Sequence, residues 1–245
     1  MKNISNKFSH ILIIAFCLAT SSTAYASIKQ HDKHFCSKNM HVSIKGGGSF
    51  LSDNIDKESF SKKHDASTLF GAGIGYKFNK DFSLDLTLTN RPNYQYSVPN
   101  ADLLPGVPGN ATQAFSSTAL MLEGYYTPFE WRMFSPYIVA GAGVSYNVMG
   151  DYDYKVDGVS GEIIDFTIIG KGTADFSWSI GIGTKAKVND YFSIDIGYRY
   201  TSLGKASTSN IALSSYESKY SNESGYSVGG PVSAHECTLR LVYDF

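Results

Sequence analysis

The chain lacks any long hydrophobic run beyond its first residues. After residue 26, no stretch approaches the about 20 consecutive apolar residues that a transmembrane helix requires. The chain also has only three cysteines and two tryptophans in 245 residues, and its 21 basic residues are balanced by 22 acidic ones. These absences exclude a helical membrane protein and a disulfide-rich scaffold, and they leave no basic excess to suggest nucleic acid as a partner.

The N-terminus has the pattern of a secretory signal. Lys2 and Lys7 precede an apolar run from Ile11 to Ala19, and the small-residue site Ala24-Tyr25-Ala26 follows. A positively charged start, a short apolar segment and small residues before a cleavage site are typical of signal peptides. We therefore expect cleavage after Ala26, which leaves residues 27–39 as a short periplasmic segment.

Two cysteines remain after cleavage, and we expect no bond between them. Cys36 precedes the first predicted strand, whereas Cys237 lies eight residues before the C-terminus. At about 3.3 Å per residue along adjacent strands, the two would be roughly 25 Å apart, which is beyond disulfide reach. His31 and His34 near Cys36 are metal-ligand types, but this short leader is a weak metal signal, and we expect neither a metal nor a cofactor.

The last eleven residues alternate between two chemistries. Glu236, Thr238, Arg240, Val242 and Asp244 fall on one face of a strand, because successive side chains point to opposite sides. The other face is apolar and ends on an aromatic ring: Cys237, Leu239, Leu241, Tyr243 and Phe245. This pattern predicts a strand with one face in lipid.

The same alternation recurs in seven further segments. They span residues 40–51, 68–78, 82–91, 118–126, 137–148, 175–188 and 192–201. Eight alternating strands predict an all-β fold, an eight-stranded antiparallel up-and-down transmembrane β-barrel over residues 40–245.

The connections between these strands sort into two classes that alternate along the chain. Short ones lie near residues 79–81, 127–136 and 189–190. Long ones lie near residues 52–67, 92–114, 149–173 and 202–233. Short turns on one rim and long loops on the other are typical of outer membrane barrels, with the long loops extracellular. Residues 149–173 include the apolar stripe Ile163, Ile164, Phe166, Ile168 and Ile169, which predicts an extension of the flanking strands beyond the membrane.

The charged residues decide between a membrane barrel and a soluble lipocalin-like barrel, because the two predict opposite faces. The polar face collects charges of both signs, which would pair across a narrow lumen. This predicted lumen charge network comprises Lys45, Lys77, Asp85, Arg91, Glu123, Lys185, Asp195, Arg199, Glu236 and Arg240. The apolar face instead has aromatic residues near the strand ends, as interfacial belts do: Phe50, Tyr76, Phe78, Phe82, Tyr126, Phe176, Tyr200, Tyr243 and Phe245. The pattern favours the membrane barrel.

Four stretches resemble a known family. They are PYIVAGAGVSY at 136–146, WSIGIG at 178–183, FSIDIGYRY at 192–200 and the terminal LVYDF. The chain resembles the OmpA-like and OmpX/Ail-type small outer membrane barrels, and within that group the Adr surface adhesins of rickettsiae. The resemblance implies a cell-surface adhesin that binds a host serum or matrix protein such as vitronectin, with complement evasion as a consequence. It also implies that the terminal Phe245 is read by the barrel insertion machinery.

We expect binding to host proteins to involve the long loops and no catalytic step. Candidate contact residues are Tyr152, Tyr154, Lys155, Phe166, Lys171, Tyr216, Lys219, Tyr220 and Tyr226. Tyrosine offers large contact area with a polar tip, although these rings could equally pack loop against loop. A structural barrel in contact with outer membrane lipid but without a host ligand is the alternative that the sequence leaves open.

Two chemical sites are less favoured. Ser233 and His235 fall on one face of the last strand, as in some lipid-modifying outer membrane enzymes, but Glu236 points to the other face. The acidic residues between Asp151 and Asp165 place Glu162 at a calcium-loop position, but Lys155 replaces a ligand and Val156 replaces the required glycine.

Overall fold

The computed structural model describes residues 39–52, 66–104, 107–157, 163–168, 170–207, 212–214 and 229–245. The chain divides into two compact units, residues 1–37 and 38–245, and all the described residues belong to the second. The predicted signal peptide, Cys36 and nearly all of the predicted periplasmic segment therefore lie outside the described residues.

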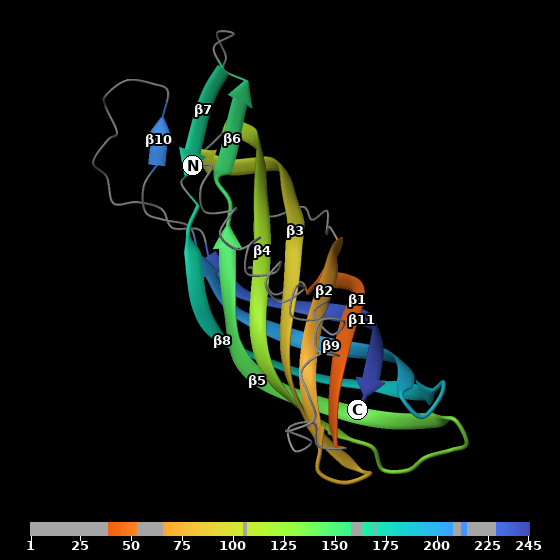
Figure 1. Ribbon diagram of the computed structural model, residues 1–245. Helices are drawn as coiled ribbons and strands as arrows, with labels where there is room; N and C mark the ends of the chain where they lie inside the picture. The colour runs from red at the N-terminus through yellow and green to blue at the C-terminus, as the bar shows by residue number, and fades with distance from the viewer. Residues whose placement is uncertain are drawn as a thin grey trace, which may run out of the picture. The chain divides into compact units, whose positions relative to one another are not determined.

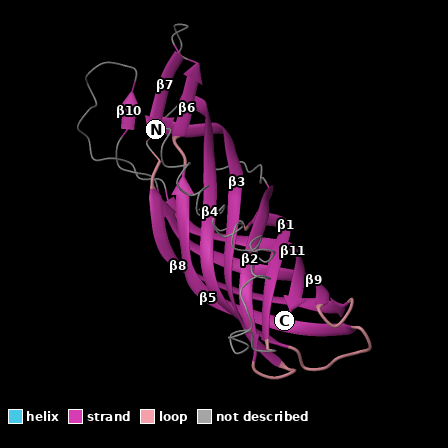
Figure 2. Ribbon diagram, viewed as in Figure 1, coloured by secondary structure: helices cyan, strands magenta, loops and turns pink. Residues whose placement is uncertain are grey.

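The described residues form strands, and none of them lies in a helix that could cross a membrane. The strands are β1 (Met40–Leu51), β2 (Ala66–Lys77), β3 (Phe82–Leu104), β4 (Val107–Tyr126), β5 (Phe134–Met149), β6 (Tyr152–Asp157), β7 (Ile163–Ile168), β8 (Gly172–Lys187), β9 (Phe192–Ser207), β10 (Ala212–Ser214) and β11 (Gly229–Asp244). Figures 1 and 2 show them as one continuous, strongly curved antiparallel sheet.

Eight of these strands close into a barrel. The order around the wall is β1, β2, β3, β4, β5, β8, β9 and β11, and β11 pairs with β1. The closing register places Ile44 opposite Leu241 and Lys45 opposite Arg240. The predicted eight-stranded antiparallel barrel is confirmed.

The predicted faces are also confirmed. In β1, Ile44 is 61% exposed on the outer wall, whereas its neighbour Lys45 is only 9% exposed inside. The other barrel strands alternate in the same way, so the polar residues line the lumen and the apolar residues cover the outside. This arrangement is opposite to that of a soluble barrel, in which the apolar residues fill the interior.

One predicted loop is a strand hairpin. Residues 92–114 were expected to form a long loop, partly because Pro92, Pro99 and Pro108 interrupt them. Instead β3 continues to Leu104 and β4 begins at Val107, and the two strands pair as far as Leu104 opposite Val107. The ladder shifts register between Arg91 and Tyr94 and again between Val98 and Ala101, where Pro92 and Pro99 fall. A proline is tolerated in a sheet where a bulge removes the need for its missing N–H.

The predicted loops at residues 149–173 and 202–233 also contain continued strands. The apolar stripe within residues 149–173 predicted this extension for the first of them. The pair β6 and β7 has Tyr152 opposite Ile168, the same register in which Val148 of β5 lies opposite Gly172 of β8. Strand β10 pairs with β7, with Ala212 opposite Ile168. This is the same register in which Ser202 of β9 lies opposite Trp178 of β8. The wall therefore continues past this rim, here called the extended rim, as β3, β4, β6, β7 and β10 (Figure 1).

The opposite rim, here called the short-turn rim, is made of compact connections. Asn79 accepts hydrogen bonds of 2.8 Å from the N–H groups of Asp81 and Phe82. Asn189 does the same for Tyr191 and Phe192, also at 2.8 Å. Such Asx turns reverse the chain in few residues. The C-terminus lies at this rim, where the N–H of Phe245 donates to the carbonyl of Met40 over 3.1 Å.

The lumen requires glycine at position 75, which yields a stability prediction. A Cβ at Gly75 would lie 2.3 Å from Asp85 Oδ1 and 2.3 Å from His41 Nε2, whereas a Cβ at Gly124 would find its nearest atom at 3.8 Å. We expect Gly75→Ala to lower the free energy of unfolding by about 1–3 kcal/mol, because overpacking forces neighbours to shift. Urea unfolding in phospholipid vesicles measures the change. Gly124→Ala is the matched control, and equal effects of the two variants would contradict this account.

Candidate functional site

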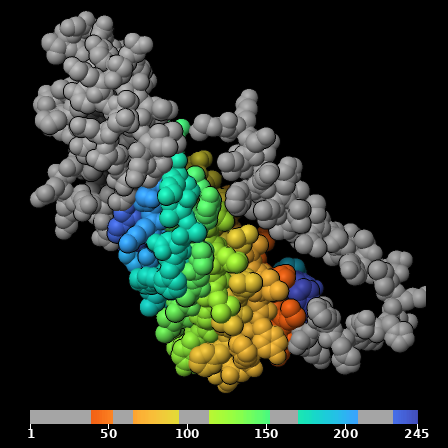
Figure 3. Space-filling view, turned by 90° about the vertical axis from the view of Figure 1, so that its left-hand side faces the viewer, coloured from red at the N-terminus to blue at the C-terminus, as the bar shows by residue number. Residues whose placement is uncertain are grey.

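The outer wall of the barrel is a continuous apolar surface. Figure 3 shows this wall as adjoining bands that run in strand order from orange through green to blue. Its exposed side chains include Ile44, Ile74, Leu122, Ile182 and Leu239. Aromatic rings gather near the short-turn rim, where Phe82 stacks on Tyr126 with centroids 4.7 Å apart and Tyr243 meets Phe245 at 5.2 Å. A wall with this pattern fits a bilayer with interfacial aromatic belts.

Inside the barrel, the level nearest the short-turn rim centres on Arg240. Its guanidinium contacts Asp85 at 2.6 Å and Asp195 at 2.8 Å. Asp85 also contacts His41 Nε2 at 2.9 Å, and the hydroxyl of Tyr137 donates to Asp195 over 2.5 Å. The guanidinium carbon of Arg240 lies 4.5 Å from the ring centre of Tyr125, which adds a cation–π contact.

The middle level centres on Glu123. Its carboxylate accepts hydrogen bonds from Arg199, from Lys45 at 3.5 Å and from the hydroxyl of Tyr125 at 2.9 Å. Arg199 also donates to the oxygen of Tyr125 over 2.6 Å. All four side chains are buried, so each charge depends on its partner rather than on water.

The upper level centres on Glu236, one of the charges first seen in the terminal strand. Arg91 Nε contacts its carboxylate at 2.6 Å, and Ser49 and Thr201 donate to it over 3.3 Å and 3.2 Å. The three levels follow the inward residues His41, Lys45 and Ser49 of β1, which are spaced four apart and so rise by about 13 Å per level along the strand.

An apolar cap covers the upper level. Tyr94 and Phe115 are fully buried with ring centres 5.5 Å apart. They pack in one cluster with four more residues of the extended rim: Met149, Leu203, Ala206 and Val232. The hydroxyl of Tyr94 donates to Ser49 over 2.6 Å, which joins the cap to the charges below. The cap and the paired charges are buried and occupy much of the lumen of the described barrel.

The structure brings most of the predicted lumen residues together and adds others. Lys77 pairs with Asp244 at 2.6 Å near the short-turn rim, and Lys185 lies opposite Asp195 in the register of β8 and β9. His41, Tyr125 and Tyr137 were not named as members of the network, although they alternate with the outward residues of their strands. Their positions on the inward face were the available signal.

Strand β9 contains a bulge near the extended rim. Gly204 has φ of 74°, and Leu203 is the extra residue between the pairs Val232–Gly204 and Ser233–Ser202. Asn147 donates to the carbonyl of Leu203 at 2.6 Å, and Asp175 accepts the N–H of Lys205 at 2.7 Å. These bonds tie the bulge in β9 to β5 and β8.

The candidate contact residues lie at or beyond this rim where the structure describes them. Tyr152, Tyr154 and Lys155 belong to β6, and Phe166 belongs to β7. Lys171 is exposed just before β8. Tyr216, Lys219, Tyr220 and Tyr226 lie outside the described residues.

The less favoured chemical sites do not assemble among the described residues. His235 Nδ1 lies 2.6 Å from the hydroxyl of Tyr198 on the outer wall, and Ser233 is buried. Glu236 is bound to Arg91 inside the barrel, on the other face of β11. In the acidic stretch, Asp151 accepts the N–H of Gly170 at 2.8 Å, and Glu162 lies outside the described residues.

The chain is similar to known outer membrane proteins. A family model described as an outer membrane protein β-barrel domain matches residues 13–245. The chain is 26% identical over 263 residues to outer membrane protein PagN of Salmonella typhimurium, and the match spans all of both chains. It is 23% identical over 204 residues to a putative adhesin of Rickettsia canadensis, with 81% of this chain and 84% of the relative covered. The solved structure of Neisserial surface protein A aligns at 15% identity and a TM-score of 0.46, covering 85% of this chain and 98% of that one.

The lumen charges yield a second stability prediction. We expect Glu123→Leu to lower the free energy of unfolding by about 3–5 kcal/mol, because it leaves Arg199 and Lys45 buried without their anion. Urea unfolding in phospholipid vesicles tests this. The control is Asp190→Asn, which removes the exposed 3.4 Å pair with Lys187 and should change little. A Glu123→Leu barrel as stable as the parent would show that the buried network does not stabilise the fold.

The filled lumen also predicts electrical behaviour. The full chain reconstituted in a planar lipid bilayer should carry no steady ionic current, because paired side chains and the apolar cap leave no continuous water path. A larger porin in the same bilayer is the positive control. Stable single-channel steps from the folded chain would contradict a filled lumen.

Proposed function

This chain belongs to the family of outer membrane proteins with a β-barrel domain, and on that premise we propose that it is a surface adhesin that binds host extracellular proteins. In an outer membrane barrel the short turns face the periplasm and the long connections face the outside. The extended rim is then the extracellular end of the molecule. Its strands and loops are the surface that a host protein would meet.

The filled lumen is the observation that carries this proposal. Arg240, Glu123 and Glu236 hold their partners at successive levels, and Tyr94 and Phe115 close the top. A lumen occupied by paired charges and an apolar cap favours a function at the surfaces of the barrel. The outer wall is apolar and suits lipid, which leaves the extended rim as the part of the described molecule suited to an aqueous partner.

The continued strands support binding of a large ligand. Strands β3, β4, β6, β7 and β10 continue the paired sheet beyond the rim, and a surface held by strand pairing would lose less entropy on binding than a flexible loop. The relative from Rickettsia canadensis bears the name of an adhesin. That name supports a role in attachment and supports no catalytic step.

The ligand class follows from the resemblance to rickettsial surface adhesins. We infer a serum or matrix protein, with vitronectin as the first candidate and complement evasion as the benefit of coating the surface with it. At the other end of the chain, Phe245 lies on the outer wall at the short-turn rim with Tyr243 beside it. We assign these residues to recognition by the barrel insertion machinery.

Surface display tests the adhesin role. The full chain is displayed on a non-adherent bacterium, and cells are mixed with serum and probed for bound vitronectin. Replacing residues 151–170 by a short Gly/Ser turn between β5 and β8, together with residues 208–228 by a second such turn, should abolish capture. Heat-modifiable migration on gels should stay intact, because the eight barrel strands remain.

The matched control is a three-residue Gly/Ser replacement of residues 79–81, a turn of the short-turn rim between β2 and β3, which should leave capture unchanged. Capture that survives both extended-rim replacements would place binding elsewhere. An intact, displayed chain that captures no serum protein would favour the alternative of a structural barrel without a host ligand.

A further inference from the structure

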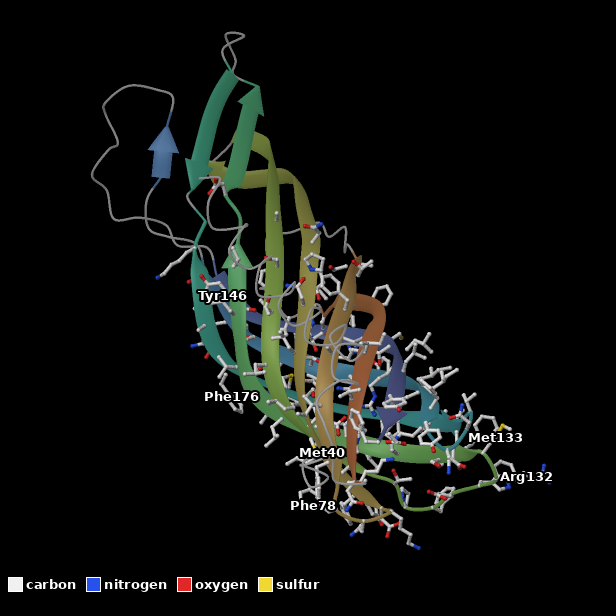
Figure 4. All side chains as sticks on the ribbon, in the orientation of Figure 1. Met40, Phe78, Arg132, Met133, Tyr146 and Phe176 are labelled. Atoms are coloured by element: carbon white, nitrogen blue, oxygen red, sulfur yellow. The ribbon has the colours of Figure 1, made fainter. Side chains whose placement is uncertain are left out.

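The connection between β4 and β5 carries large apolar side chains into solvent. Phe129 is 60% exposed, Trp131 70% and Met133 56%. In Figure 4, Arg132 and Met133 lie at the tip of this connection, at the same end of the barrel as Met40 and Phe78. A turn that faced only the aqueous periplasm would have no reason to carry so many apolar side chains.

The exposure does not come from a loosely held backbone. The N–H of Trp131 donates to the carbonyl of Phe134 over 2.8 Å, and the N–H of Phe134 returns a bond of 2.9 Å. Arg132 between them has φ of 57°, a conformation that a residue with a Cβ adopts at a cost. The carbonyl of Met133 also accepts the N–H of Lys187 at 2.9 Å. The fold therefore holds these side chains outward.

A neighbouring turn extends the same surface. Lys187 ends β8, and the following Val188 and Tyr191 are exposed as well. We name the five side chains Phe129, Trp131, Met133, Val188 and Tyr191 the rim patch. Tyr191 stacks on Tyr243 with centroids 6.4 Å apart, and Tyr243 meets Phe192 and Phe245 at 5.0 Å and 5.2 Å. Tyr191 thus joins the rim patch to the aromatic belt of the outer wall.

The chemistry of the rim patch identifies its partner. Tryptophan and tyrosine favour the boundary between hydrocarbon and headgroups, where the ring is in apolar surroundings and its polar atom is hydrated. Arg132 lies within this patch and the exposed Lys187 beside it, so that their cationic ends can reach lipid phosphates while their stems stay in apolar surroundings. We propose that the rim patch inserts into the periplasmic phospholipid leaflet and anchors this side of the barrel in the membrane interface.

The two tryptophans of the chain make this testable by fluorescence. Trp178→Phe leaves Trp131 as the sole tryptophan of the full chain, which is folded into phosphatidylcholine vesicles and checked by heat-modifiable migration. Lipids brominated near the headgroup end of the acyl chain should quench Trp131 more than lipids brominated near the methyl end. Its emission should be blue-shifted relative to the unfolded chain, and iodide present on both sides of the membrane should quench it weakly.

The matched control is Trp131→Phe, which leaves Trp178 on the outer wall of β8 and should be quenched by brominated lipid whatever the position of the turn. Red-shifted Trp131 emission that iodide quenches and brominated lipid does not would overturn the proposal. That result would place the rim patch in water, where it would instead be a docking surface for a periplasmic protein.

Discussion

Charge pairing across the lumen is the constraint on which this structure depends. An eight-stranded barrel encloses only enough space for side chains, so every inward charge must find its partner on another strand. Arg240 of β11 meets Asp85 of β3 and Asp195 of β9, and Glu123 of β4 meets Arg199 of β9. Arg240 and Asp195 lie opposite each other on neighbouring strands, whereas the contacts with Asp85 and between Glu123 and Arg199 join strands that are not neighbours in the wall. Removing one partner leaves the charge of the other buried without an opposite charge, which lowers the stability of the barrel.

The same pairing limits what the barrel can do. Side chains that fill the lumen leave no path for a solute, and the apolar cap of Tyr94, Phe115 and Leu203 separates the charges from the extended rim. The outer wall faces lipid, and the rim patch extends that contact past the strand ends. The barrel is therefore best understood as a rigid base, and the extended rim carries the proposed binding function into the surroundings of the cell.

The alternation of residues was enough to predict both faces of the wall. A shift of one residue would move every side chain of a strand to the opposite face, so the pattern leaves one assignment. It could not say which charges pair. That depends on strand tilt and register, which place Lys45 near Glu123 although the two lie on opposite sides of β2 and β3. The cap was missed because Tyr94 falls in a segment whose prolines suggested a loop, and Phe115 lies between that segment and the strand predicted from residue 118. Pro92 and Pro99 instead coincide with register shifts, which a sequence alone does not reveal. All nine candidate contact residues remain a prediction, and those beyond residue 214 also lie outside the described residues.

Site-specific photocrosslinking on whole cells tests most directly the claim that a filled barrel displays a binding surface. A crosslinkable residue is placed at the exposed Lys171 beside β7, or at Ile182 on the outer wall of β8. The account predicts a covalent adduct with a serum protein from position 171 and none from position 182. Adducts from neither position, or from position 182 alone, would contradict it.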